Sequence, residues 1–286
     1  MTPVNSRWQC RDRSLDLTEP VVMGVLNVTP DSFSDGGRFR DHQAALAHAR
    51  AMVEAGAAIV DVGGESTRPG ASPAGVDQEL SRVIPVIEAL RRDSGVFISI
   101  DTSKPEVMRA AVTAGADIIN DVRALAEPGA VEAAALCGAG LCLMHMQGEP
   151  RTMQDAPHYV DVVADVGAFL AARIRACREA GVDIARLAID PGFGFGKRIA
   201  DNLALLKNLA SFEALGVPVV VGLSRKSMLA KLTGRAVDQR LAGSVALAAI
   251  AVLNGARIVR AHDVAATVDA VRAAAAVSKG ANFDGT

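Results

Sequence analysis

Short apolar runs alternate eight times with alanine-rich stretches of helical period, and this alternation constrains the fold more than any other feature of the sequence. The runs that we predict to be strands are 21–28, 58–62, 96–100, 117–120, 140–144, 187–189, 217–221 and 257–259. The predicted helices are 43–55, 77–92, 105–114, 129–137, 160–180, 201–215, 239–253 and 264–275. Repeated β-α units with such apolar strands imply parallel pairing with helices on the faces. The pattern predicts an α/β fold, a (β/α)8 or TIM barrel, with an open doubly wound sheet as the alternative.

Glycines separate several predicted helices from the strands that follow them. The sequence is A-G-A at 55–57 and 114–116, A-G-V at 180–182 and L-G-V at 215–217, as expected for glycine just after a helix end. A chain of 286 residues is within the range of one such barrel. We therefore predict a polar N-terminal extension over 1–18, a single barrel domain over 19–278 and a flexible tail over 279–286.

Composition excludes several classes of partner. A formal net charge of -2 provides no basic field for nucleic acid, and an aromatic content of 3% is too low for a base-stacking surface. The apolar segments are too short to span a membrane, and the polar N-terminus is unlike a secretory signal. The four cysteines form no CxxC motif, which fits a reduced compartment. We expect a cytoplasmic protein that binds small molecules and neither nucleic acid nor membrane.

Polar side chains follow every predicted strand, where the ends of barrel strands share one mouth. These residues are Asn27, Glu65, Thr67, Arg68, Asp101, Asn120, His145, Asp190, Lys226, Arg260 and His262. At any single position, an ordinary solvent-exposed polar residue is an equally good interpretation. Acids, amides and bases at all eight strand ends together favour a functional site.

Three loops around this mouth have unusual compositions. The loops 27–37 and 63–73 are rich in glycine, proline and small polar residues, and we interpret them as lids, with ordinary surface loops as the alternative. The segment D-P-G-F-G-F-G-K at 190–197 resembles a phosphate-binding glycine loop but lacks both the GxGxxG and the Walker A spacing. Its glycines could let the backbone approach a flat ligand, with Phe193 or Phe195 packing against that ligand. Arg260 and His262 follow the last strand, where barrels often bind phosphate, and they suit a diphosphate.

Eight motifs follow one another along the chain: G-V-L-N-V-T-P-D-S-F-S-D-G-G, G-G-E-S-T-R-P-G, S-I-D-T-S-K-P, I-I-N-D-V, L-M-H-M-Q-G, D-P-G-F-G-F-G-K, S-R-K-S and R-A-H-D-V. Together, in this order, they resemble the dihydropteroate synthases of the pterin-binding family. The likeness extends over about residues 14–277. It implies a transferase of folate biosynthesis, in which p-aminobenzoate displaces diphosphate from 6-hydroxymethyl-7,8-dihydropterin diphosphate to give 7,8-dihydropteroate.

The resemblance also implies roles for individual residues of this chain. The implied pterin pocket contains Asp101, Asn120, Met144, Asp190, Phe195 and Lys226. The implied diphosphate site contains Asn27, Thr67, Arg68, Arg260 and His262, with Asn27 as the protein ligand of a Mg²⁺ cofactor. The implied p-aminobenzoate site contains Phe33, Thr67, Pro69, Phe195, Lys226 and Ser227. The residues implied in catalysis are Asp101, Asp190, Lys226, Arg260 and His262.

Other functions share some of these features. A pterin-dependent methyltransferase would use the same acids but would not need Arg68, Arg260 and His262 around a diphosphate. A catalytically inactive barrel that only binds pterin or a protein, and a barrel enzyme of phosphosugars, are further alternatives. Alanine-rich stretches at 244–253 and 265–276 could form the face of a homodimer, as the resemblance implies, although such helices also occur in monomers.

Overall fold

A computed structural model describes residues 6–29, 38–65, 74–149 and 152–280 of the chain, and it contains a closed parallel barrel. The barrel strands are β3 (Val21–Asn27), β4 (Ile59–Gly63), β5 (Phe97–Asp101), β6 (Ile118–Asp121), β7 (Gly140–Met144), β8 (Leu187–Asp190), β9 (Val220–Gly222) and β10 (Ile258–Ala261). They are hydrogen-bonded in the order β8-β7-β6-β5-β4-β3-β10-β9. The last gap closes where the N–H of Ile189 donates to the carbonyl of Pro218 at 3.0 Å. The predicted barrel and all eight of its strands are therefore confirmed.

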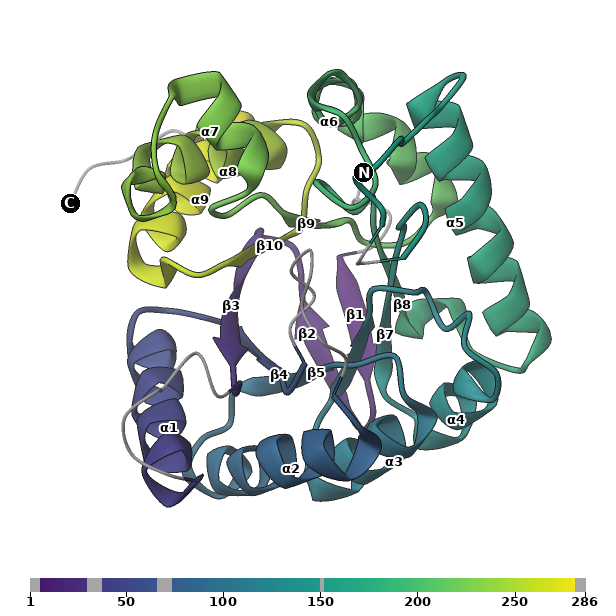
Figure 1. The fold of residues 1–286 in the computed structure, drawn as a ribbon, viewed down its shortest axis with the longest axis vertical. Helices are drawn as coiled ribbons and strands as arrows, with labels where there is room; N and C mark the ends of the chain where they lie inside the picture. Colours follow the sequence, from purple (N-terminus) through teal and green to yellow (C-terminus); the bar gives the residue numbers. More distant parts are fainter. Residues whose placement is uncertain (1–5, 30–37, 66–73, 150–151, 281–286) are drawn as a thin grey trace.

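Helices form an outer ring around these strands (Figure 1). They are α1 (Arg38–Glu54), α2 (Val76–Asp93), α3 (Pro105–Ala114), α4 (Ala130–Cys137), α5 (Val162–Glu179), α6 (Ile199–Lys207), α7 (Ser227–Thr233), α8 (Leu241–Leu253) and α9 (Val264–Lys279), with the 3-10 turns η2 (Ile184–Arg186), η3 (Leu209–Leu215) and η4 (Val237–Gln239). Asp161 caps α5 by accepting hydrogen bonds from the backbone N–H groups of Val163 and Ala164. No helix within the described residues is long and apolar enough to cross a membrane.

The predicted N-terminal extension contains a hairpin that closes one end of the barrel. Its strands, β1 (Arg7–Cys10) and β2 (Arg13–Asp16), pair antiparallel. Trp8 is fully buried and donates from Nε1 to the carbonyl of Arg186 at 2.9 Å. With Leu15 and Leu17 it joins a cluster that includes Met23 and Ile59 near the starts of β3 and β4. The hairpin therefore seals the end of the barrel opposite the strand carboxyl ends, and the mouth stays at the other end.

Two predicted α-helical segments differ from the structure. The predicted helix 201–215 ends at Lys207 and continues as the 3-10 turn η3, because Asn208 and Ser211 use their side chains to bond backbone carbonyls nearby. Between β9 and β10 lie two helices, α7 and α8, where the alternation predicted one. The short helix α7 ends at Gly234, whose φ of 70° is left-handed.

Candidate active site

Residues from several consecutive strand ends line one small cavity at the mouth of the barrel. They include Asp101, Asn120, Met144, Asp190, Phe195 and Lys226, the complete set implied for a pterin pocket. Asp101, Asn120 and Asp190 lie in β5, β6 and β8, while Lys226 follows β9. Arg260 of β10 lines the same cavity. The structure thus brings together carboxylates, an amide and two cations around a space walled by apolar side chains.

A network of charged and polar side chains connects the wall of this cavity to the interior of the barrel. Arg260 donates from Nη2 to Oδ2 of Asp101 at 2.8 Å and from Nε to Oδ2 of Asp61 at 2.6 Å. Asn120 donates from Nδ2 to the same oxygen of Asp61 at 3.1 Å. Asp61 lies in β4 and is fully buried. Four neighbouring residues of the site are therefore held by one another rather than by solvent.

Burial changes the protonation of the groups in this cavity. Loss of solvation raises the pKa of Asp101 to about 7; the charge of Arg260 opposes this rise, and the charge of Asp61 adds to it. Burial likewise raises the pKa of Asp190, against a hydrogen bond from the Gly192 N–H. It lowers the pKa of Lys226 to about 8 despite the nearby charge of Asp190. Groups with shifted pKa values in one cavity are typical of a functional site.

The glycine-rich segment after β8 packs against the loop after β7. A Cβ on Gly192 would lie 1.9 Å from the carbonyl oxygen of His145, and one on Gly196 would lie 2.3 Å from that of Gln147. Both glycines have positive φ, of 71° and 60°. The glycines therefore allow the close approach of two loops, and this packing accounts for them without a bound phosphate.

Lys197 fastens these two loops together from inside. Its Nζ donates to the carbonyls of Gly192 at 2.8 Å and Phe195 at 3.0 Å, and lies 2.9 Å from Nδ1 of His145. The ring of His145 makes an edge contact with Phe169 of α5, at 4.9 Å between centroids. Lys197 and His145 are both buried. The expectation that His145 faces the mouth is therefore wrong, because its ring packs outside the strands.

Lys226 lines the cavity, and His262 directly follows β10, whose Arg260 lines it as well. The ammonium of Lys226 lies 4.1 Å from the centroid of the Phe195 ring, a cation–π distance. The Oγ of Ser224 accepts from the backbone N–H of His262 at 3.2 Å and lies 3.0 Å from Nδ1 of the same residue. When the Ser224 hydroxyl donates to Nδ1, the ring proton is on Nε2, where a phosphate oxygen can accept it. Ser227 begins α7 beside Lys226 and is exposed.

Asn27, the expected magnesium ligand, ends β3 and is separated from Asp101 of β5 by Gly63 of β4. A methyl group added to Gly63 would lie 3.8 Å from Oδ1 of Asn27 and 3.9 Å from Oδ2 of Asp101, so both oxygens flank the space above this glycine. No group of three histidine, cysteine or acidic side chains in the described part of the chain could hold a metal. One amide oxygen beside an open space fits Mg²⁺, which keeps water and substrate phosphate as its other ligands.

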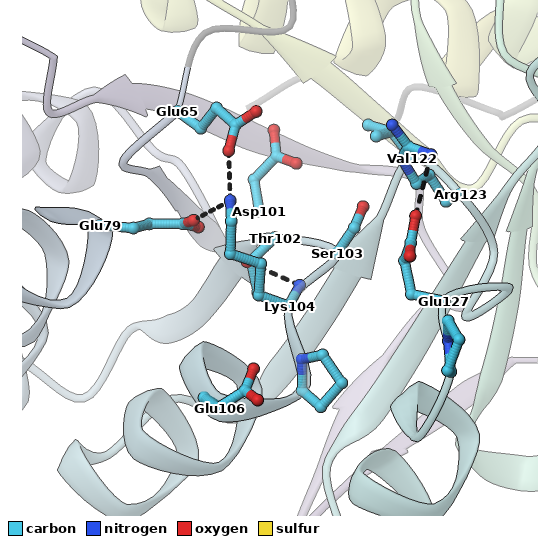
Figure 2. A pocket seen from close by; sticks show the side chains of 12 residues that line it. Glu65, Glu79, Asp101, Thr102, Ser103, Lys104, Glu106, Val122, Arg123 and Glu127 are labelled. Atoms are coloured by element: carbon cyan, nitrogen blue, oxygen red, sulfur yellow. Dashed lines mark hydrogen bonds and ion pairs between the residues drawn. The ribbon is translucent and has the colours of Figure 1, made fainter. Parts of the chain in front are cut away.

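A larger cavity, of about 310 Å³, lies on the other side of Asp101 (Figure 2). Lys104 lies between two acids there: its Nζ donates to Glu65 and, at 2.6 Å, to Oε2 of the fully buried Glu79. Arg123 pairs with Glu127 on the opposite wall at 2.9 Å. Lys104 directly precedes α3, so its ion pair with Glu65 attaches the segment after β4 to the start of that helix.

Four expected site residues, Phe33, Thr67, Arg68 and Pro69, lie outside the described residues, as do the expected lids over most of their length. Their roles stay predictions from the sequence.

The family of pterin binding enzymes matches residues 23–262 of this chain. The dihydropteroate synthase of Escherichia coli strain K12 is 55% identical over 259 residues, which cover 91% of this chain and 92% of that protein. The chain belongs to the dihydropteroate synthases of the pterin-binding family. The dihydropteroate synthase of Neisseria meningitidis serogroup B, 47% identical over 272 residues, is a more distant relative in the same family.

Solved structures of dihydropteroate synthases match the whole architecture. The enzyme of Xanthomonas albilineans with 4-aminobenzoic acid has a TM-score of 0.90 and 55% identity, with 96% of this chain and 98% of that chain covered. The same organism's enzyme in complex with 7,8-dihydropteroate has a TM-score of 0.87 and 52% identity, with 95% and 98% covered. The family and the fold that the motifs implied are thus confirmed.

Asp61 bonds two of the expected site residues, Arg260 and Asn120, but was not itself predicted from the sequence. It lies inside A-I-V-D-V, which we interpreted only as a buried strand. A single acid within an apolar strand is itself a signal, since a charge is rarely buried without a partner. The partners are Arg260, 199 positions away along the chain, and Asn120, 59 positions away, so only the fold could identify them.

Proposed function

We propose that this protein condenses 6-hydroxymethyl-7,8-dihydropterin diphosphate with p-aminobenzoate to give 7,8-dihydropteroate and diphosphate. The observation that carries the proposal is the single cavity in which Asp101, Asn120, Asp190 and Lys226 converge, with Arg260 on its wall. The family membership and the matching structures with 4-aminobenzoic acid and with 7,8-dihydropteroate support the same substrates.

The pterin ring would bind by its polar edge to the buried acids and amide. Asp101 and Asp190 accept hydrogen bonds from ring N–H and amino groups, while Lys226 and the amide of Asn120 donate to ring acceptors. Met144 and Phe195 would pack against the ring faces. A flat heterocycle that alternates donors and acceptors satisfies this set better than an apolar or purely anionic ligand would.

The diphosphate would lie between the ends of β3 and β10. Arg260 and His262 supply N–H donors there, and we propose Thr67 and Arg68 as further donors. Asn27 would hold Mg²⁺, which when bound neutralises charge on the diphosphate leaving group. The position of Arg260, in the cavity wall and bonded to Asp101, supports a role at the bond between pterin and diphosphate.

We propose that diphosphate leaves early, with cleavage of the methylene C–O bond before the new C–N bond forms. Asp101 and Asp190 then stabilise the positive charge spread over the methylene and the electron-rich ring. The amine of p-aminobenzoate attacks this carbon and loses a proton, so no covalent bond to the protein is needed. Pterin diphosphate would bind first, and p-aminobenzoate would follow at Phe33, Thr67, Pro69, Phe195, Lys226 and Ser227 once the loops 29–37 and 67–73 close as lids.

The assembly and the location of the protein are further parts of the proposal. The last three helices each carry exposed apolar side chains, namely Leu232 of α7, Leu241, Ile250 and Leu253 of α8, and Val277 of α9. These exposed side chains support a homodimer through α7 to α9. All four cysteines are free thiols, which supports a reducing cytoplasm.

Turnover of the purified protein tests the proposed reaction directly. We expect dihydropteroate from p-aminobenzoate and the dihydropterin diphosphate with Mg²⁺, and none after chelation. The Asp190→Asn variant, which keeps the shape of the side chain but removes a charge in the cavity, is the matched control and should lose most of the activity. Binding of the pterin without turnover by the wild-type protein would instead favour an inactive binder or a methyltransferase.

A further inference from the structure

Asp61 is a fully buried acid whose contacts join the two halves of the site. One of its oxygens, Oδ2, accepts hydrogen bonds from Nε of Arg260 at 2.6 Å and from Nδ2 of Asn120 at 3.1 Å. Its other oxygen, Oδ1, is buried and has no hydrogen-bond partner among the described residues. The carboxylate is therefore stabilised by two residues that we place in different subsites, Arg260 with the diphosphate and Asn120 with the pterin.

The contact with Asp61 fixes the orientation of the Arg260 guanidinium. Nε and one N–H of Nη2 lie along one edge of this planar group, and that edge is divided between Asp61 and Asp101. Each acid therefore receives one hydrogen bond from this edge of Arg260. The remaining N–H donors of Arg260 project from the other edges of the guanidinium, where an anion can accept them.

The same edge of an arginine forms a two-bond fork with a single carboxylate when only one is in reach. Without Asp61, Nε and Nη2 of Arg260 would both be able to bond Asp101. Such a fork would occupy both oxygens of Asp101 and would turn the guanidinium away from β4. Both consequences act on the substrate, because the fork removes an acceptor from the pterin pocket and moves a donor of the diphosphate site.

We propose that Asp61 is a positioning residue that holds Arg260 between the subsites, so that Asp101 stays available to the pterin and Arg260 to the diphosphate. The inference rests on the proposed function. It assigns no contact with substrate to Asp61, which acts through Arg260 and Asn120.

Variants at position 61 and at its neighbour in the sheet provide the test. Asp61→Asn keeps an acceptor oxygen for Nε, whereas Asp61→Ala removes it. Ser99 faces Asp61 in the register of β4 and β5, is equally buried, and its Oγ has no partner among the described residues. Ser99→Ala therefore controls for the effect of substituting any buried side chain at this depth of the barrel. We expect this variant to have wild-type affinities for both ligands.

The measurements are the dissociation constants of a non-reacting pterin and of inorganic diphosphate, and the kcat and KM values. For Asp61→Ala we expect affinity for both ligands to fall by roughly 10- to 100-fold, the range of a hydrogen bond to a charged group. Asp61→Asn should recover part of this loss. The KM of p-aminobenzoate at saturating pterin diphosphate should stay unchanged. A general loss of stability would not weaken the first two ligands and leave this KM unaffected.

The double variant Asp61→Ala/Arg260→Ala decides whether Asp61 acts through Arg260. If it does, Asp61→Ala should add little to the loss of diphosphate affinity that Arg260→Ala already causes. The double variant removes both buried charges, so it also replaces Asp61→Ala if that variant fails to fold. Circular dichroism and thermal unfolding check the fold of every variant.

Two results would overturn the inference: wild-type affinities in Asp61→Asn and Asp61→Ala, or losses that add fully in the double variant. If the wild-type protein makes no dihydropteroate, the proposed reaction fails separately. The binding constants of the pterin and of diphosphate then still test the role of Asp61.

Discussion

Several side chains that line the cavity are charged although they are largely shielded from water. Asp101, Asp190, Lys226 and Arg260 line one small cavity, and the fully buried Asp61 bonds Arg260 from behind it. Burial opposes the charge of Arg260, but Asp61 and Asp101 outweigh it and raise the pKa of the guanidinium. The acids therefore keep a permanent positive partner, while the pKa of Asp101, about 7, makes the charge of that residue depend on pH near neutrality.

Pterin affinity should depend on pH through Asp101. Its pKa is raised to about 7, so the carboxylate that accepts from the ring is increasingly protonated as the pH falls below that value. We expect affinity to fall by about tenfold per pH unit below 7 and to level off above it. Titration calorimetry with a non-reacting pterin between pH 5.5 and 8.5 measures this dependence.

The Asp101→Asn variant is the control for that titration, because it cannot ionise. It should bind pterin weakly at every pH and should lose the dependence near pH 7. Tight binding by Asp101→Asn would show that Asp101 is not an acceptor for the ring.

Diphosphate binding should draw a proton onto His262. Burial and the charge of Arg260 lower the pKa of this imidazole to about 4, so it is neutral in the free protein at pH 6. An anion at the ring raises that pKa, and binding at pH 5 to 6 should therefore take up protons. Calorimetry in buffers of different ionisation enthalpy counts them. His262→Gln should remove the uptake, and equal uptake in this variant would assign the proton to another group.

Helices, strands and turns were largely predictable because their signals are local. The four glycines expected after helices, at positions 56, 115, 181 and 216, all have positive φ in the structure. Predicted strand limits agree with the observed ones within a few residues, and β7 (Gly140–Met144) agrees at both ends. Helix α7 was missed because seven residues are too few for a helical period to be recognised.

Contacts between elements were not predictable in the same way. The segment after β8 is rich in glycine, and two of its glycines, Gly192 and Gly196, admit the carbonyls of His145 and Gln147. Lys197, in the same segment, reaches the loop after β7 through Nδ1 and the carbonyl of His145. In both cases the partner belongs to another loop, and local composition does not identify it.

The hairpin β1–β2 should contribute to stability without contributing to substrate binding. Trp8 is fully buried at the closed end of the barrel, and replacing such a side chain with alanine costs about 3–5 kcal/mol. We expect Trp8→Ala to lower the free energy of unfolding by that amount and to leave both KM values unchanged. Urea unfolding followed by circular dichroism measures the loss. Trp8→Phe, which keeps most of the side-chain volume, should lower the free energy of unfolding by less. A changed KM in either variant would show that the closed end of the barrel does affect substrate binding.

The whole barrel explains which parts of the site the sequence could predict. Parallel strands deliver their carboxyl ends to one mouth, so polar residues at strand ends, such as Asp101 and Lys226, can be grouped from the sequence alone. Asp61 lies one level deeper in β4, where the strand-end rule does not apply. Its role follows from closure of the barrel, which brings β4, β6 and β10 around one centre.

Association of two copies should depend on the face formed by α7 to α9, which lie together on one side of the barrel (Figure 1). Ile250 and Leu253 of α8 are 43% and 49% exposed, and burying them against a second copy would remove apolar surface from water. We expect sedimentation velocity to give a dimer for the wild type and a monomer for Ile250→Glu/Leu253→Glu, because a dimer would bury the added charges unpaired. Leu136→Glu, on α4 and 86% exposed, introduces the same charge far along the ring and should remain dimeric. A monomeric wild type, or a dimer that tolerates both glutamates, would move the interface away from α8.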